Sequence, residues 1–169
     1  MRRPYYYNPR MHSFGNVGLG GGFHAALAPL ITILITQRAY SGAEPRQWLH
    51  SQLGNNTCVD FGCGTGSSTR ANDVGVDTSP QMIEMAKLLS PGTEFEIGNA
   101  EEWGEADAFE DATLSFVLHE MPREARIAAM SNACRVSRNA VHVMDIHEDY
   151  SPSQVMLLGE PYLNDYKKH

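Results

Sequence analysis

The chain has few cysteines. Three occur among its 169 residues, and one of them, Cys63, lies inside a glycine-rich stretch. So few cysteines do not form the framework of a small disulfide-rich domain, and they favour a reducing compartment. We therefore expect an intracellular protein, cytoplasmic or organellar.

The sequence also lacks a long apolar run and an excess of basic residues. Its most apolar run, Ala25 to Ile35, is interrupted by Pro29 and is shorter than the roughly 20 residues that cross a bilayer. It starts too deep in the chain for a secretory signal. The net charge of −7 and the pI near 5.4 provide no basic field for nucleic acid or anionic membranes. We expect no transmembrane segment and no nucleic-acid partner.

Two parts of the chain differ in composition. Residues 1–43 are predicted to form an N-terminal arm and helix, with mostly irregular structure up to residue 23, a flexible hinge at Gly18–Gly22 and an apolar helix over residues 24–40. Tyr5, Tyr6, Tyr7 and His12 of this arm form either a lid over a bound ligand or a surface that docks on another protein.

Residues 44–169 are predicted to form an α/β domain. The expected strands are 57–61, 74–77, 94–97, 113–118 and 140–146, and the expected helices are 44–53, 79–89, 122–134 and 152–166. Strands that alternate with helices are typical of a doubly wound parallel sheet covered on both faces.

The most informative stretch is Cys58 to Gly66, a short apolar strand followed by glycine at every second position. Glycine adopts positive φ without strain and lets a ligand approach the backbone. A second expected strand ends soon afterwards at Asp77, whose carboxylate can accept both hydroxyls of a ribose. Such a loop at the carboxyl end of a parallel strand forms a crevice of nucleotide size.

The motifs VDFGCGTG and GVDTSPQMIEMAK, with Gly98–Glu102 and Leu114–Pro122, resemble the class I S-adenosylmethionine-dependent methyltransferases. The resemblance covers about residues 45–150 and implies a Rossmann-like methyltransferase fold with S-adenosylmethionine as cofactor. It implies that the loop contacts the methionine part, that Asp77 binds the ribose and that Asn99 stands near the adenine. The cofactor-binding residues expected on this basis are Asp60, Gly62, Cys63, Gly64, Gly66, Asp77, Thr78, Met82, Asn99, Ala100 and Leu118.

Two further side chains are candidates for catalysis. His119 and Glu120 follow the fourth strand, where the resembling family places groups near the reactive methyl. Histidine can act as a general base near neutral pH, although solubility and capping explain a polar turn equally well. His147, Glu148 and Asp149 point in different directions as consecutive residues, so we expect a solvated loop and no metal site.

The sequence departs from the family pattern in two places. Seven residues, Ser67 to Asp73, separate the glycine loop from the second strand. Extended, they span roughly 23 to 25 Å, but as a helix they would rise only about 10 Å, so the first crossover helix is predicted to be short or missing. The antiparallel pair of strands that normally follows the fifth strand in this family is also absent, so we expect either a truncated chain or a partner that covers the exposed sheet edge.

These observations lead to two main hypotheses. The first is a methyltransferase acting on a small molecule. The second is a methyltransferase-like subunit that has lost catalysis and serves a structural or assembly role in a larger complex. Nicotinamide binding is a weaker third alternative, because the loop has alternate glycines instead of G-x-G-x-x-G spacing.

Overall fold

The structure, a computed structural model, describes residues 4–169. Five parallel strands form one sheet in the order β3-β2-β1-β4-β5. Their bounds are β1 Cys58–Phe61, β2 Val74–Asp77, β3 Glu94–Ile97, β4 Phe109–Ser115 and β5 Ser137–Met144. The chain runs outward from β1 to β3 and then returns to β4 on the other side of β1, so the strand order reverses between β1 and β4. This confirms the doubly wound α/β fold, in which ligands usually bind outside the carboxyl ends of the strands where the order reverses.

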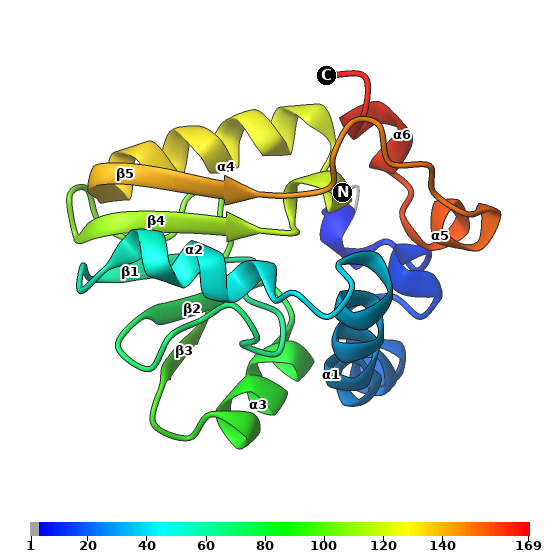
Figure 1. Ribbon diagram of the computed structural model, residues 1–169, viewed down its shortest axis with the longest axis horizontal. Coiled ribbons are helices and arrows are strands. Elements are labelled where there is room, and N and C mark those ends of the chain that lie inside the picture. The colour runs from blue at the N-terminus through cyan, green and yellow to red at the C-terminus, as the bar shows by residue number, and fades with distance from the viewer. Residues whose placement is uncertain (1–3) are drawn as a thin grey trace.

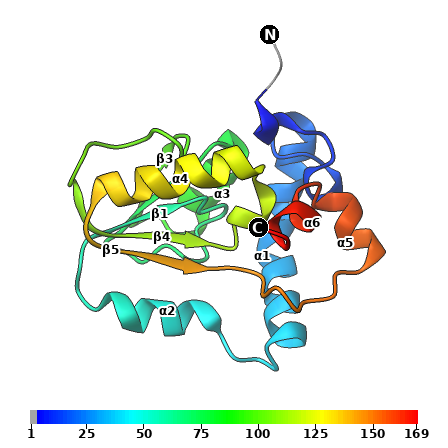
Figure 2. The ribbon, with the colours of Figure 1, turned by 90° about the horizontal axis from the view of Figure 1, so that it is seen from above.

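The helices are more numerous at the two ends of the chain than the sequence predicts. They are η1 Tyr5–Tyr7, η2 Met11–Ser13, α1 Gly18–Ala39, α2 Pro45–Leu53, α3 Pro80–Leu89, η3 Leu118–Glu120, α4 Arg123–Val136, α5 Gln154–Gly159 and α6 Leu163–Tyr166. α2 and α4 lie on opposite faces of the sheet (Figure 2). The sheet is therefore covered on both sides, as a parallel sheet requires.

The main core lies between the sheet and α4. Ala125, Ala129 and Ala133 recur at every fourth position of α4 and are buried in one cluster with Phe61 and Leu114 of the strands. Small side chains at this spacing let the helix lie close to the sheet. A second cluster joins α3 to the sheet through Phe95, Ile83, Ala86 and Cys63.

The carboxyl edge of the sheet is covered by both ends of the chain. In Figure 1 the strands point toward the N-terminal segment, α1, α5 and α6, which gather on that side of the molecule. α1 packs against α3, α5 against η2, and α6 against η3. We call residues 4–39 and 150–169 together the cap. The predicted division of the chain at residue 43 stays a prediction.

The prediction of a flexible hinge at Gly18–Gly22 is wrong. These residues form the first turns of α1. A Cβ atom at Gly20 would lie 1.8 Å from the carbonyl oxygen of Phe14, and one at Gly21 would lie 2.6 Å from the carbonyl carbon of Asn16. The glycines therefore permit the close approach of the arm to the helix, and the helix begins six residues earlier than expected.

Three other predicted elements differ in their bounds. The fourth strand was expected at 113–118, but β4 ends at Ser115 because Phe116 has a φ of 55°, which breaks the extended ladder. The single C-terminal helix expected over 152–166 is two short helices, α5 and α6, separated at Pro161, which cannot continue a helix. The fifth strand begins three residues before the predicted start.

The crossover from β1 to β2 contains no helix between Gly66 and Val74, which confirms the prediction from its length. Arg70 holds this segment in place of a helix. Its guanidinium donates to the carbonyl oxygens of Gly54 and Asn56 at 2.8 and 2.7 Å and to both carboxylate oxygens of Asp73 at 2.8 Å. Asp73 is 2% exposed, so the pair is largely shielded from water.

Replacing Arg70 by alanine is expected to lower the free energy of unfolding by about 3 kcal/mol, because it leaves the buried Asp73 carboxylate without its cation. Urea denaturation followed by circular dichroism measures this change. Arg138→Ala is the control, because Arg138 is exposed and its guanidinium makes one contact, to the Asp107 carbonyl; we expect a change below about 0.5 kcal/mol. Equal effects for the two variants would contradict the role given to Arg70.

Within residues 4–169 no strand follows β5. In the same part of the chain, no single helix has both the length and the apolarity to cross a membrane, although the bent pair Tyr5–Ser13 and Gly18–Leu34 meets these criteria jointly by length and composition.

Candidate functional site

The glycine loop after β1 has the backbone conformation that the sequence predicts. Gly62, Gly64 and Gly66 have φ angles of 70°, 54° and 84°. A Cβ at Gly62 would lie 2.3 Å from Val117, and one at Gly66 would lie 2.7 Å from Phe95. At Gly64 a Cβ would meet no atom within 4 Å. The outer glycines therefore serve packing, while the middle one borders open space at the carboxyl edge.

Asp77 ends β2 directly beside this loop. Its Oδ2 accepts a hydrogen bond from the backbone N–H of Gly64 at 3.0 Å, and its Oδ1 accepts one from the N–H of Ser79 at 2.8 Å. A carboxylate can accept about four hydrogen bonds, so acceptor capacity is left. Burial raises the pKa of Asp77 to about 6, against the opposing effect of the two N–H groups.

Asp60 lies below the loop inside β1 and is 1% exposed. Its carboxylate accepts three hydrogen bonds, from the hydroxyls of Ser68, Thr69 and Thr113 at 2.8, 2.7 and 2.9 Å. Burial raises its pKa, although these hydroxyls oppose the shift. Asp60 thus connects the short crossover to β1 and β4. These contacts leave little of its acceptor capacity for a ligand.

Three other candidates lie around α3. Ser79 caps the helix by accepting from the N–H of Met82, and the preceding Thr78 is half-buried. Met82 is 6% exposed. Cys63 turns into the cluster with Ile83 and Phe95, and burial raises the pKa of its thiol well above the ordinary value. Cys63 thus anchors the loop to α3 and β3 through its own side chain.

The turn after β3 contains Asn99 and Ala100. The Asn99 side chain accepts from the N–H of Glu101 and donates to its carboxylate, at 3.1 and 3.2 Å. The Ala100 carbonyl accepts from Asn132 of α4 at 2.9 Å. Asn99 is half-buried at the carboxyl edge, so its side chain shapes the turn that borders the crevice.

His119 is oriented by an aspartate at the end of β5. Its Nδ1 lies 2.6 Å from Oδ1 of Asp145, and Asp145 also accepts from the backbone N–H groups of Leu118 and His119. Burial disfavours the charged imidazole, but the hydrogen bond to Asp145 and the nearby carboxylates outweigh it and raise the pKa of His119. The side chain of Asp145 is 2% exposed, so this pair is rigidly placed. The sequence analysis did not identify Asp145.

Glu120 is bound by the N-terminal arm. Its Oε1 lies 3.0 Å from Nε2 of His12, while Nδ1 of His12 lies 3.0 Å from Oε1 of Glu160. Burial opposes both charges, but the interaction with His12 lowers the pKa of Glu120 to about 2, and the two carboxylates raise that of His12 well above its usual value. The ring of His24 lies 4.2 Å from that of His12, and burial lowers the pKa of His24 to about 4.

The aromatic arm also reaches the carboxyl edge. Tyr5 packs against the main core and is close to Tyr162 of the C-terminal segment, with ring centroids 6.1 Å apart. Burial, Glu101 and Glu120 raise the pKa of its hydroxyl. Tyr5 and His12 thus lie beside residues of the carboxyl edge, and the two roles predicted for the arm, a lid or a docking surface, stay predictions. The sequence could not reveal Glu160 or His24 as neighbours of His12, since neither belongs to a recognisable motif.

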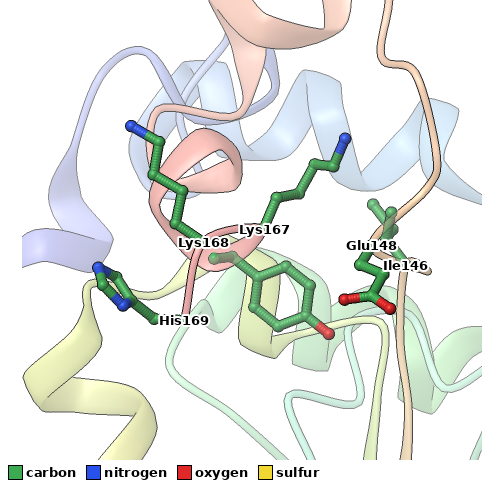
Figure 3. A pocket seen from close by; sticks show the side chains of 6 residues that line it. Ile146, Glu148, Lys167, Lys168 and His169 are labelled. Carbon is green, nitrogen blue, oxygen red and sulfur yellow. The ribbon is translucent and has the colours of Figure 1, made fainter.

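Two cavities lie at the C-terminal part of the cap. One of about 350 Å³ is lined by Ile146, Glu148, Tyr166, Lys167, Lys168 and His169; Figure 3 shows Lys168 on the side away from Glu148. The other, of about 400 Å³, lies between α4 and α6, and Leu118 contributes to its lining. Leu118 is also buried in the main core with Phe61 and Val117, and its role at the glycine loop stays a prediction. The candidates, from Asp60 to Glu120, surround the carboxyl ends of β1, β2, β3 and β4.

Comparison with known proteins agrees with this geometry. Residues 58–140 match the family model of a methyltransferase domain. A methyltransferase from Thermotoga maritima superimposes with a TM-score of 0.62 at 19% identity, over 86% of this chain and 68% of that one. A TehB-like methyltransferase from Corynebacterium glutamicum gives 0.60 at 17% identity, over 83% of each chain. A Haloferax volcanii methyltransferase solved with its Trm112 activator gives 0.52 at 16%, over 69% and 55%.

The fold and the glycine loop define a methyltransferase-type α/β domain. The match of residues 58–140 to the methyltransferase-domain model and the shared fold of the solved structures confirm the resemblance to class I S-adenosylmethionine-dependent methyltransferases that is seen in the sequence. The chain covers about half the length of some of the solved structures that it matches.

Proposed function

We propose that this protein transfers a methyl group from S-adenosylmethionine to a small molecule at the carboxyl edge of its sheet. The observation that carries the proposal is the pairing of Asp77 with Gly64. A half-buried carboxylate with free acceptor capacity stands beside a glycine whose Cβ position is open. These residues fit the ribose and the backbone-facing part of the cofactor.

The protein's own groups have distinct roles in this proposal. Asp77 accepts hydrogen bonds from the ribose hydroxyls, Gly62 to Gly66 provide the surface against which the cofactor lies, and Asn99 and Ala100 border the adenine. Asp60, Cys63, Thr78 and Met82 hold the loop and α3 in place. The cofactor supplies an already activated methyl group, so the main task of the protein is to align the acceptor.

His119 is the better of the two candidate general bases. When Nδ1 carries the proton and donates a hydrogen bond to Asp145, Nε2 is free to take a proton from the molecule that receives the methyl group. Glu120, with a pKa of about 2, is a weak proton acceptor. We therefore assign Glu120 to holding the N-terminal arm, and His119 to proton transfer where the acceptor needs it.

The position of the cap favours a small molecule as the methyl acceptor. Tyr5, His12 and Glu160 come from opposite ends of the chain and cover the edge at which the candidate residues meet. A polymer would have to displace both segments to reach the glycine loop. The net charge of −7 further disfavours nucleic acid as the acceptor.

Calorimetric titration of the protein with S-adenosylhomocysteine tests the proposal. We expect binding in the micromolar range, followed by transfer of labelled methyl from S-adenosylmethionine to a component of a metabolite extract. Absence of heat and of equilibrium-dialysis binding at millimolar S-adenosylhomocysteine would exclude the cofactor role.

The affinity for S-adenosylhomocysteine is expected to fall about tenfold per pH unit below pH 6. Only ionised Asp77 is a full acceptor for the ribose, and its pKa of about 6 lies above the ordinary value for aspartate. Burial raises the pKa of Asp77, so the free energy of unfolding increases as the pH falls from about 6 to about 4 and Asp77 takes up a proton. Protonation of Asp77 therefore does not unfold the protein, and the loss of affinity at low pH reflects the lost acceptor. Calorimetry from pH 5 to 8 measures the slope, and Asp77→Asn is expected to abolish it.

A structural or assembly role is the second candidate. The exposed side of α1 carries large apolar side chains, including Leu19 at 98% exposure, Phe23 at 57% and Leu30 at 56%. Together with the missing crossover helix, this surface supports a subunit that functions within a complex. A chain that binds no S-adenosylhomocysteine and stays monodisperse only in the presence of a partner would favour this role.

A further inference from the structure

Three chemically complementary side chains meet where the cap covers the sheet. His12 comes from η2, Glu120 from η3 after β4, and Glu160 from the residue after α5. One ring nitrogen or carboxylate oxygen from each lies within 4.8 Å of the other two. Two ligands of one ion, each at about 2.2 Å, lie at most about 4.4 Å apart, so these separations are close to those that one ion allows. The two carboxylates contact different ring nitrogens of His12, so coordination requires one of them to move from its ring nitrogen to the ion.

Two buried polar atoms at this cluster have no hydrogen-bond partner. Glu160 is 8% exposed, and its Oε2 accepts no hydrogen bond, although its Oε1 contacts His12. His24 is 9% exposed, its ring stacks near that of His12, and its Nδ1 is also without a partner. Buried polar atoms are normally satisfied, so these two point to a group that the protein atoms do not supply.

We propose that His12, Glu120 and Glu160 bind one divalent transition-metal ion. The two carboxylates supply two negative charges that match the charge of the ion. One imidazole nitrogen with two carboxylate oxygens is a donor set suited to Zn²⁺ or Mn²⁺, whereas Mg²⁺ and Ca²⁺ prefer oxygen alone. Three protein ligands leave at least one position for water or a small molecule.

His12 precedes both glutamates by more than one hundred residues, and the ion would join the N-terminal arm, the turn after β4 and the C-terminal segment. Glu120 directly follows His119, which places the ion beside the candidate base. The proposal does not depend on methyl transfer, because the ion could bind whether or not the glycine loop holds a cofactor.

The test uses the full-length protein, freed of metal by chelation, and Mn²⁺ as the probe. Free Mn²⁺ is measured by electron paramagnetic resonance and the heat of binding by calorimetry at pH 7.5. We expect one ion per chain and a rise in melting temperature with Mn²⁺ concentration. Glu160→Gln and His12→Gln, which preserve side-chain size better than alanine, are each expected to weaken binding at least about tenfold.

His147→Ala is the matched control. His147 also lies near a carboxylate, 3.6 Å from Asp149, but both side chains are largely exposed, so its loss should leave the stoichiometry and affinity unchanged. No Mn²⁺ or Zn²⁺ binding by the native protein at millimolar concentration would overturn the proposal, and so would binding that survives both cluster substitutions. In either case a protonated His12, and not a metal ion, would hold the carboxylates of Glu120 and Glu160 together. The titration of the native protein decides this even if a variant fails to fold.

Discussion

Replacing Asp60 by alanine is expected to lower the free energy of unfolding by about 4 kcal/mol. The substitution removes the acceptor of three hydroxyls, those of Ser68, Thr69 and Thr113, two of which belong to buried residues. An unsatisfied buried polar group costs about 1–3 kcal/mol, and losses above 4 kcal/mol are typical of broken buried networks. In a domain of this size, the change corresponds to a drop of about 10 °C in melting temperature.

Chemical denaturation and calorimetric melting measure this effect. Asp60→Asn should recover more than half of the loss, because an amide oxygen still accepts and a hydroxyl can turn to accept from the amide nitrogen. Asp149→Ala, at an exposed position, should change stability by less than about 0.5 kcal/mol. A loss below about 1 kcal/mol for Asp60→Ala would show that the short crossover is held by other contacts.

Replacing Asp77 by alanine is expected to reduce the affinity for S-adenosylhomocysteine at least about 100-fold, which is about 2.7 kcal/mol. Hydrogen bonds to a charged acceptor contribute about 1.5–3 kcal/mol each, and a ribose offers two hydroxyls. The substitution also removes an acceptor from the N–H of Gly64, so the loop loses its anchor at the position that borders open space.

Calorimetric titration at pH 7.5 compares this variant with the native protein. Glu94→Ala is the matched control, because it removes an exposed carboxylate from the amino end of the neighbouring strand and should leave affinity unchanged. Circular dichroism separates loss of binding from loss of fold. If native protein binds and Asp77→Ala binds equally well, another residue holds the ribose, and the proposed orientation of the cofactor is wrong.

The elements near the glycine loop were predictable because their signals are local. The strand before Gly62, the aspartate that ends β2 and the serine–proline start of α3 each follow from adjacent residues, and the structure contains all three. The missing crossover helix followed from chain length alone. The resemblance to the methyltransferase family followed from the order of these motifs.

The cap was not predictable in the same way. Glycine normally breaks helices, but at Gly20 and Gly21 the close approach of Phe14 and Asn16 requires it inside α1. Likewise, the end of β4 depends on Phe116, a large residue at positive φ that propensity disfavours there. Tertiary packing outweighs local preference at these positions.

The residues that contact His119 and Glu120 were harder to predict than the cap. His119 and Glu120 themselves were predicted as candidates because they directly follow a strand. Asp145 and Glu160 become their neighbours only when β5 and the C-terminal segment fold back. A single sequence contains no local signal for such pairings.

The way in which the cap is assembled has a consequence for how the protein folds. The contact of His12 with Glu160 closes a loop of nearly the whole chain, so it carries a large entropic cost that is repaid only after the intervening sheet exists. The central strands can therefore form before the cap covers the carboxyl edge of the sheet. The N-terminal arm reaches its final position only after residues 150–169 have docked, so the candidate binding site is the last part of the molecule to fold.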